Sequence, residues 1–296
     1  SSFKISLKSI HNTLNTSIYI EKSLNSSKCL YNDKNISKKD LNNAFPCYAL
    51  VFGFNNLLLN DSSYRRDFVD TGMFHVEPKS HGIFASYNKT LKQRNYLIKT
   101  KKYKDIDFWN NELIKYNASL YDYRNLYYSK LSEEFDNIIV QLKNTLPDLY
   151  TEVGSLEMSY YKGWNDDNYA EELNNSFEKD TRVGYTTAGT HRSDILIKSN
   201  NKPVKESGSM STLVLSCLLI FLAKSSVFHV KHGYKPVLLI DDLFFGIDNK
   251  NLKTVIKLLI YSKSNIVVSA PNIYKEILEE ISSKNDEIEL INAGEF

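Results

Sequence analysis

The sequence predicts an α/β protein in which a parallel β-sheet carries a long helical insertion, and three observations lead to this prediction. The first 60 residues consist of short runs in which polar and apolar residues alternate. Residues 64–146 contain glycine only at positions 72 and 82, and their apolar residues recur at helical spacing. From residue 155 onwards, continuous apolar runs alternate with helical patterns, which is typical of parallel βαβ units. We therefore expect three parts, at residues 1–62, 63–154 and 155–296.

The first two parts differ sharply in pattern. In residues 1–62, clusters of Asn, Asp and Ser separate the alternating runs, which predicts a β-meander with polar turns. In residues 63–154, the span 108–146 reads as one long amphipathic helix that Pro147 closes. A helix of this length exceeds an ordinary core helix, so we expect an elongated helical lobe.

The third part is expected to complete the α/β portion. Its apolar runs predict strands at 155–161, 195–198, 237–240 and 266–269. Helical patterns predict helices at 169–180, 211–228, 251–261 and 274–282. Because strands and helices alternate, we expect these strands to run parallel.

The overall composition is that of a folded protein without a disulfide framework. Of the 296 residues, 42% are hydrophobic and 24% are charged, which argues against disorder and against a fibrous repeat. The three cysteines are scattered and no Cys or His pair stands at ligand spacing, so we expect neither disulfides nor structural zinc. The longest apolar run, residues 213–223, is too short to span a bilayer. We expect a cytoplasmic protein with no membrane partner.

The charge balance directs attention to single cations. The net charge is only +2, so any nucleic-acid surface has to be a local patch. Of the 37 Lys and Arg residues only six are Arg, which makes lysine the default solubilising charge. Each Arg is therefore expected where a planar, forked donor matters.

Two carboxylates follow the most apolar of the expected strands. Residues 237–240 are all apolar, and Asp241 and Asp242 come directly after them. In open α/β sheets, ligands bind at the carboxyl ends of the strands. In a nucleotide-hydrolysing protein of this class, the first acid holds Mg²⁺ and the second polarises the attacking water. The alternative is an acidic turn that only caps the strand, because Asp is common in turns.

A polar cluster between two expected strands is a second candidate. Residues 189–194 read Gly-Thr-His-Arg-Ser-Asp. Arg192 offers paired donors beside His191, and the glycine allows close backbone approach, so the segment is a candidate phosphate site. An exposed hairpin turn is the alternative, and for this segment alone it is the favoured one.

Cations of the helical part are candidates for nucleic-acid contact. Arg65 and Arg66 are adjacent, so on a helix their side chains point about 100° apart. One of them can then pair with Asp67 or Asp70 while the other faces a partner. The remaining candidates are Arg94, Lys101, Lys102 and Lys104. A charged, solvated face is the default interpretation of these segments, and nucleic-acid contact is the second.

Several of these segments together resemble the RecF family of ABC-type ATPases. In chain order they are Tyr-Arg-Arg-Asp-Phe-Val-Asp at 64–70, Gly-Met-Phe-His-Val-Glu-Pro at 72–78, Leu-Lys-Gln-Arg-Asn at 91–95 and Phe-Trp-Asn-Asn-Glu-Leu at 108–113. The resemblance continues through 161–164, Asp180, 184–186 and 189–194, and it ends with the two aspartates and residues 266–270. It covers most of residues 40–296, in the same order and at similar spacing.

This resemblance implies an ABC-type (P-loop NTPase-like) ATPase head, incomplete at its N-terminus, with an inserted helical lobe. It implies ATP and Mg²⁺ as cofactors and a homodimer that encloses two nucleotides. DNA would be the ligand, and RecR- and RecO-like proteins would be the partners in loading a recombinase. By the same resemblance Asp241 would be the Mg²⁺ ligand and Asp242 the catalytic carboxylate. Ser209 would stand in the signature motif and Asp248 in the D-loop, both against nucleotide.

The sequence departs from the family pattern at its nucleotide-binding motifs. No Gly-x-x-x-x-Gly-Lys-Ser/Thr occurs in the 296 residues, and the family carries this motif before the point where this sequence begins. The family's Ser-Arg-Gly-Gln signature reads Ser-Met-Ser-Thr at 209–212. Without the N–H groups and lysine of a phosphate loop, little holds the β- and γ-phosphates. We predict that this polypeptide does not hydrolyse ATP at an appreciable rate.

The expected function is that of a RecF-like protein of DNA replication and recombinational repair. It would bind DNA at single-strand–duplex junctions and, in complete form, ATP. The alternative is a non-catalytic DNA-binding or scaffold homologue that has lost nucleotide binding. A third possibility is an unrelated Mg²⁺-dependent enzyme that uses the two aspartates.

Overall fold

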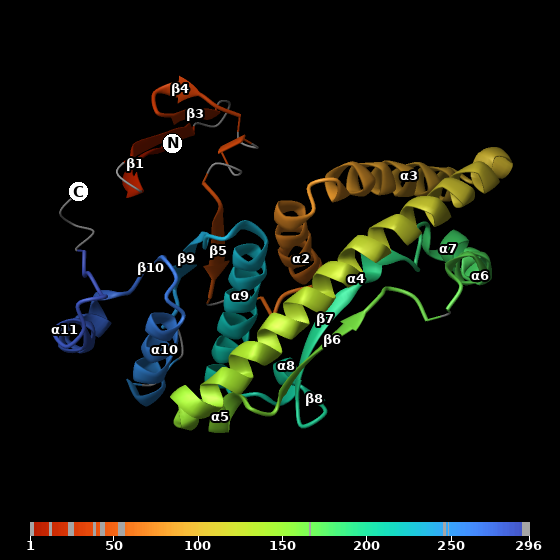
Figure 1. The fold of residues 1–296 in the computed structure, drawn as a ribbon. Helices are drawn as coiled ribbons and strands as arrows, with labels where there is room; N and C mark the ends of the chain where they lie inside the picture. Colours follow the sequence, from red (N-terminus) through yellow and green to blue (C-terminus); the bar gives the residue numbers. More distant parts are fainter. Residues whose placement is uncertain are drawn as a thin grey trace.

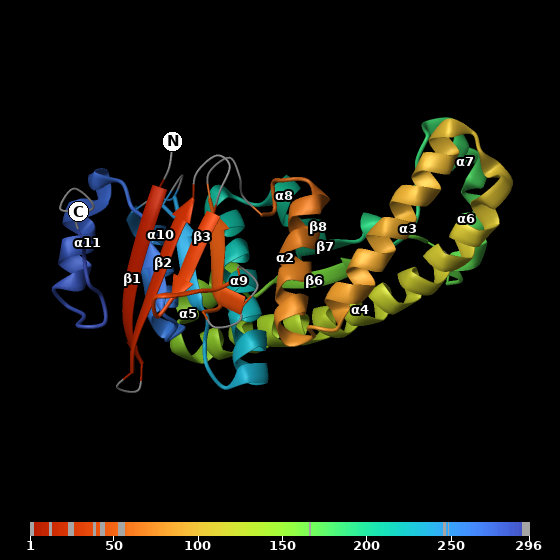
Figure 2. The same ribbon diagram turned by 90° about the horizontal axis from the view of Figure 1, so that it is seen from above.

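The computed structural model describes residues 3–11, 14–22, 27–37, 40–41, 45–52, 57–165, 167–244, 247 and 249–291. Figures 1 and 2 show a long helical arm that extends from one side of a small parallel sheet, with a separate antiparallel sheet at the N-terminal end. Helix α9 (Met210–His232) lies between the arm and the parallel sheet.

The N-terminal sheet is the β-meander that the sequence predicts. Strands β1 (Phe3–His11), β2 (Leu14–Lys22), β3 (Ser27–Tyr31) and β4 (Lys34–Asn35) pair antiparallel in chain order. Asn32 and Asp33 both adopt positive φ, at 48° and 63°, which matches the two-residue turn between β3 and β4. A backbone N–H of β2, from Ser17, donates to the Asn32 side chain and fixes this turn.

The parallel sheet is built from distant parts of the chain. Its order is β10 (Ile266–Val268), β9 (Val237–Asp241) and β5 (Cys47–Val51), with both pairs parallel. Helix α10 (Asn249–Tyr261) makes the crossover from β9 to β10, as the alternation of strands and helices predicts. The sheet therefore joins the N-terminal and C-terminal parts of the chain.

The arm is an antiparallel helical hairpin on a short base. Helix α2 (Ser62–Val76) leads into α3 (Ser80–Thr100), and α4 (Ile106–Thr145) returns along it after the short turn Tyr103–Asp105. The predicted long helix is thus confirmed, and Pro147 begins the next helix, α5 (Pro147–Val153). At 40 residues, α4 is about 60 Å long.

Two expectations for the third part are wrong. Strands β6 (Leu156–Tyr161), β7 (Asp194–Ser199) and β8 (Lys202–Pro203) form an antiparallel sheet of their own and not part of the parallel one. The helix expected at 169–180 is two helices, α6 (Tyr169–Asn175) and α7 (Phe177–Val183), which lie beside the far end of the arm (Figure 2). The short helix α8 (Val204–Ser207) then leads to α9.

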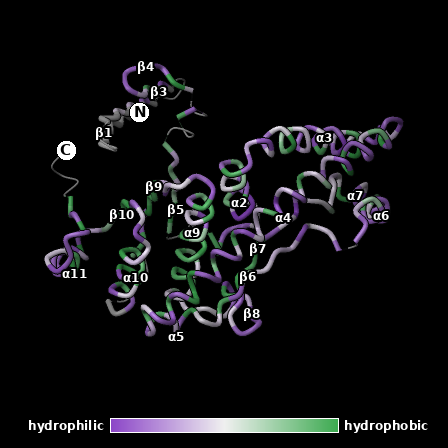
Figure 3. Tube along the Cα trace, in the orientation of Figure 1, coloured by the Kyte–Doolittle hydropathy of each residue, from purple (hydrophilic) through white to green (hydrophobic). Residues whose placement is uncertain are grey.

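Helix α9 (Met210–His232) is the centre of the core. Of the described helices it alone is long and apolar enough to cross a membrane, which the apolar run at 213–223 did not indicate. However, 83% of its most apolar window is buried inside the molecule, so here it serves as a core helix. Figure 3 shows the contrast between the apolar α9 and the hydrophilic α6. Helix α11 (Lys275–Ser282) closes the described fold after a short turn at Asn272–Tyr274.

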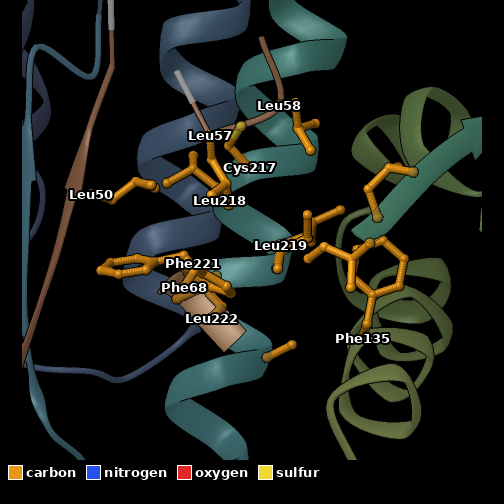
Figure 4. Close-up of a cluster of buried hydrophobic side chains, with 14 of the residues drawn as sticks. Leu50, Leu57, Leu58, Phe68, Phe135, Cys217, Leu218, Leu219, Phe221 and Leu222 are labelled. Atoms are coloured by element: carbon orange, nitrogen blue, oxygen red, sulfur yellow. The ribbon is translucent and has the colours of Figure 1, made fainter. Parts of the chain in front are cut away.

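One continuous core connects the parallel sheet to the arm. In Figure 4, Leu50 of β5 and Phe135 of α4 lie on opposite sides of Leu218 and Leu219 of α9. The same cluster of buried residues extends along the arm through Leu113 and reaches Leu173 of α6. The sheet edge and the arm therefore rest on a single packed unit.

Candidate functional site

The paired aspartates lie at the carboxyl end of the central parallel strand, as the sequence predicts. Asp241 is the last residue of β9, and its carbonyl accepts a 2.9 Å hydrogen bond from the Phe52 N–H, which continues the ladder to β5. Asp242 follows with φ of 56°, so the chain turns sharply there. Both side chains are exposed. The strand thus ends by presenting two carboxylates to solvent.

Ser269 positions this pair and was missed by sequence reasoning. Its hydroxyl donates to Oδ1 of Asp241 and accepts from the backbone N–H of Asp242 at 3.2 Å. Its own N–H donates to the Ile240 carbonyl at 2.9 Å. The signal was present in the sequence, because Ser269 directly follows β10, and neighbouring parallel strands end at the same edge.

The proposed signature serine caps a helix. Ser209 is the N-cap of α9, and its Oγ accepts from the Thr212 N–H at 3.1 Å. Two residues on, Ser211 accepts a 2.9 Å hydrogen bond from the Asn251 amide, which ties the start of α9 to the start of α10. Asp248, the expected D-loop residue, lies outside the described residues.

The sheet edge suits Mg²⁺ better than it suits a triphosphate. Mg²⁺ in nucleotide sites is held by one or two carboxylates together with phosphates and water, and Asp241 and Asp242 supply that donor set. In the described part of the chain, no group of three or more His, Cys, Asp or Glu side chains gathers around a common point. The sequence also supplies no Gly-Lys-Ser/Thr phosphate loop. The residues fit the metal half of such a site and do not fit the phosphate half.

The candidate phosphate site at 189–194 is occupied by internal contacts, so the expectation for His191 is wrong. Its Nδ1 lies 2.7 Å from the Tyr87 hydroxyl and its Nε2 lies 2.9 Å from the Thr186 carbonyl oxygen. Burial lowers the pKa of His191 to about 4, and Arg192 adds to this effect, so the ring is neutral at pH 7. Arg192 remains exposed, with its guanidinium 5.1 Å from the centre of the Tyr185 ring.

Arg65 and Arg66 join the base of the arm to the antiparallel sheet. Arg65 is only 4% exposed and forms a bidentate ion pair with Asp194 of β7, at 2.7 and 2.9 Å. Arg66 is half-buried and donates to the Ser62 hydroxyl and to the Ser193 carbonyl. Burial and the neighbouring Arg124 lower the pKa of Arg66. Arg65 is therefore a structural residue, which contradicts its expected role in DNA contact.

Arg94 is also structural, contrary to expectation. Its side chain has no exposed surface and pairs with the equally buried Asp180 of α7 at 2.7 Å. It also donates to the Asn110 side chain at 2.7 Å, which fixes α3 against α4. Thr186 accepts a further hydrogen bond from the same guanidinium. Arg94 thus fastens three helices at the far end of the arm and has no surface left for DNA.

A third buried pair, not singled out from the sequence, completes this network. Arg124 of α4 forms a bidentate ion pair with Asp70 of α2, at 2.8 and 2.7 Å. Burial opposes its charge, yet the Asp70 carboxylate raises the pKa of Arg124 overall. Arg124 also donates to the Thr190 carbonyl and the Ser193 hydroxyl. The segments at 64–70 and 189–194 therefore meet in the interior.

Lys224 of α9 anchors the core helix to α2. Its ammonium group donates to the Phe68 carbonyl at 2.9 Å and to the Thr71 hydroxyl at 2.7 Å. It also lies over the rings of Tyr48 and Phe68, at 4.4 and 4.3 Å from their centres. Burial lowers the pKa of Lys224 to about 7, although Asp70 opposes the shift.

The basic run is at the tip of the arm. Lys101, Lys102 and Lys104 lie in the turn between α3 and α4, and all three side chains are exposed. None of them forms an ion pair with a carboxylate of the described residues. Of the cations expected to contact DNA, these lysines are free to do so and Arg66 is partly so.

Comparison with known proteins places the chain in context. No family model matches the sequence. The DNA replication and repair protein RecF of Vibrio vulnificus (strain YJ016) is 29% identical over 217 residues, which are 73% of this chain and 58% of that protein. The protein of the same name from Aliivibrio fischeri (strain MJ11) is 30% identical over 216 residues, 72% of this chain and 58% of its own. This chain thus spans less than two thirds of these relatives.

Solved structures agree with the fold. The recombination mediator protein RecF of the RecFOR pathway superposes in its ATPrS form with a TM-score of 0.67, covering 91% of this chain and 75% of that one at 18% identity. Its ATP form gives a TM-score of 0.65, with 88% and 73% covered at 19% identity. The architecture is therefore that of an ABC-type, P-loop NTPase-like ATPase head with an inserted helical arm. In sequence and in fold, the chain is thus similar to proteins of the RecF family.

Proposed function

We propose that this chain acts in DNA replication and recombinational repair by binding DNA, with single-strand–duplex junctions as its targets. Its similarity to proteins named for DNA replication and repair supports this role. The observation that carries the proposal is the free lysine run at the tip of the arm, because its three ammonium groups are exposed and unpaired with described carboxylates. Recombinase loading with RecO- and RecR-like partners belongs to the same proposal, since a related structure is described as a mediator of the RecFOR pathway.

The experiment measures DNA affinity against salt concentration by fluorescence anisotropy, with a gapped duplex as the probe. Each phosphate contact removed reduces the slope of log K against log salt by about 1. The variant K101Q/K102Q/K104Q should therefore lose a slope of up to about 3. The control K253Q/K257Q/K275Q removes the same charge from exposed positions of α10 and α11 and should keep the wild-type slope.

Two results count against the proposal. If the unmodified chain does not bind DNA at low salt, DNA binding itself is refuted. If both triple variants show the wild-type slope, the lysines of the tip do not contact phosphates. Arg66→Gln, tested in the same way, shows whether the half-buried Arg66 contributes a phosphate contact to that slope.

We further propose that the sheet edge retains a weak Mg²⁺ site without ATP hydrolysis by this polypeptide. When bound, the ion would neutralise phosphate charge; Asp241 would bind it, and Asp242 would hold a water molecule beside it. Ser269 would orient the Asp241 carboxylate and hold the backbone of Asp242. A nucleotide-dependent dimer would require phosphate donors that these 296 residues do not supply as a phosphate loop.

Calorimetric titration with MgCl₂ alone, and separately with preformed MgATP, tests this second proposal. Mg²⁺ should bind the wild-type chain and should not bind Asp241→Asn, while ATP should add no affinity. Glu280→Gln is the control, since it removes an equally exposed carboxylate elsewhere. Micromolar ATP binding, or equal Mg²⁺ binding by Asp241→Asn, would overturn it.

A further inference from the structure

The tip of the arm carries exposed aromatic rings among its lysines. Tyr96 near the end of α3 is 55% exposed, Tyr103 in the turn is 37% exposed, and Phe108 at the start of α4 is 60% exposed. None of the three belongs to the hydrophobic core of the described residues. The three rings lie at the same end of the arm as the exposed lysines, so this end is a candidate binding surface.

The rings are held on a rigid support. The hydrogen bond from Arg94 to Asn110 sets the register of the hairpin, which brings Tyr96 and Phe108 to the same level along the arm. Phe108 packs edge-on against Trp109 with ring centres 5.1 Å apart. Tyr103 packs edge-on against Phe177 of α7 at 5.7 Å. Because neighbouring rings hold Phe108 and Tyr103, a ligand that stacks on these two pays little conformational entropy.

The charge of the tip favours an anionic ligand. Between residues 99 and 108 there are four exposed lysines, at 99, 101, 102 and 104, and two exposed carboxylates, at 105 and 107. The backbone of Lys101 and Lys102 closes α3 by donating to the carbonyls of Ile98 and Leu97, at 3.2 and 3.0 Å. Their side chains therefore leave a fixed backbone and remain free to contact an anion. Rings for stacking and cations for phosphates occur together.

We propose that the tip of the arm binds single-stranded nucleic acid, with Tyr96 and Phe108 stacking on unpaired bases and the lysines contacting the backbone. Sequence-tolerant binding of single strands uses this combination of aromatic platforms and positive charge. A duplex offers phosphates to the lysines, but its bases are already stacked on each other. The inference rests on the proposed DNA-binding function and adds which part of a junction the tip recognises.

The test compares three probes of equal length in anisotropy measurements: a thymidine oligonucleotide, the same strand with abasic sites throughout, and a duplex. Phe108→Ala and Tyr96→Ala should each weaken binding of the thymidine strand by about tenfold, since each removes one aromatic platform on which a base stacks. Binding of the duplex and the abasic strand should change less than twofold. Phe108→Trp should restore the affinity.

The control Tyr64→Ala removes a ring of similar exposure, 51%, on α2 and should leave all three affinities unchanged. If Phe108→Ala and Tyr96→Ala bind the thymidine strand as the wild type does, the stacking site is refuted while DNA binding stands. If the wild type binds none of the probes, the proposed function itself fails. Binding of an acidic peptide to the tip, with no preference for bases over abasic sites, would also overturn the inference.

Discussion

Arg65, Arg94 and Arg124 place their guanidinium groups inside the protein, each against a carboxylate from another element. The scarcity of arginine in the sequence marks these positions as special, because a forked donor suits a buried bidentate pair better than lysine does. The partners could not be predicted, since they lie 129, 86 and 54 positions away along the chain. The same limit explains why two of these arginines were assigned to DNA and not to the interior.

The pair of Arg124 and Asp70 predicts a large loss of stability when one partner is removed. Asp70→Ala leaves a buried, unpaired guanidinium, which should lower the free energy of unfolding by about 3–5 kcal/mol. Urea unfolding followed by circular dichroism measures this change. Glu279→Gln, which breaks the exposed pair with Lys275, should cost less than about 1 kcal/mol. Equal effects of the two substitutions would show that the buried pair is not an anchor.

Lys224 predicts a rise of stability with pH. Its folded pKa of about 7 lies below the ordinary value of 10.5, so between these values the unfolded chain binds more protons. The free energy of unfolding should therefore increase above pH 7, by up to about 1.4 kcal/mol per pH unit. Below pH 7 both states are protonated and this contribution is constant.

Urea unfolding at pH 7, 8 and 9 tests this prediction with Lys224→Met. Among the described residues, Asp70, His75 and Tyr48 interact with Lys224, and Tyr127 lies near it beside Gly72. Burial and Lys224 lower the pKa of His75 to about 4, and burial raises the pKa of both tyrosines. Neither the histidine nor the tyrosines therefore titrate between pH 7 and pH 9. In Lys224→Met the free energy of unfolding should no longer increase above pH 7, whereas in the control Lys257→Gln it should still increase. An increase that persists in Lys224→Met would show that Lys224 does not cause it.

At the scale of elements, the patterns that lie within a single segment were sufficient for prediction. The 40-residue helix and the β-meander both follow from local periodicity. The antiparallel pairing of β6 with β7 does not follow from local periodicity, because the residue pattern of one strand does not show which other strand it pairs with. Their connection depends on a close approach of two loops: a Cβ at Gly163 would lie 2.1 Å from the Gly189 carbonyl oxygen.

The packing of α2 against α4 predicts that Gly72 cannot carry a side chain. A Cβ there would lie 1.9 Å from the Tyr127 hydroxyl and 3.2 Å from the Lys224 side chain. Gly72→Ala should destabilise the protein by about 1–3 kcal/mol, through overpacking at the joint of three helices.

The matched control is Gly82→Ala in α3, where nothing lies within 4 Å of the new Cβ. It should stabilise the protein by up to about 1 kcal/mol, because alanine has the higher helix propensity. Thermal unfolding of both variants measures the difference. Similar stabilisation in the two would mean that α2 and α4 are less closely packed at Gly72 than the structure has them.

In the molecule as a whole, one core unites the arm and the parallel sheet, and this could be predicted only in part. The sequence placed Asp241 and Asp242 correctly at the end of a buried parallel strand. The sequence did not indicate that α9 would pack against both the sheet and the arm. Apolar residues occur on all sides of this helix, so their periodicity does not show which side faces which neighbour. The roles of the aspartates remain predictions.

Among the described side chains, some of those in the N-terminal part form a cluster apart from this core. The described residues of this small cluster are Cys29 and Leu41, with partly buried neighbours at Tyr31, Ile36 and Phe45, and none belongs to the main core. We predict that amides of β1–β4 exchange with deuterium well before those of α4 and α9, because their opening does not require global unfolding. Hydrogen-exchange mass spectrometry at pH 7 measures this order. Simultaneous exchange of all these elements would contradict it.

The length of α4 has a mechanical consequence. One end of this helix packs against α9 next to the sheet, and the other carries the turn with the lysines and exposed rings. Over about 60 Å, a tilt of about 10° at the inner end displaces the outer end by about 10 Å. The helix is thus a lever, because a small change of its tilt against α9 would move the exposed lysines and rings of the tip by a distance comparable to the spacing of nucleotides.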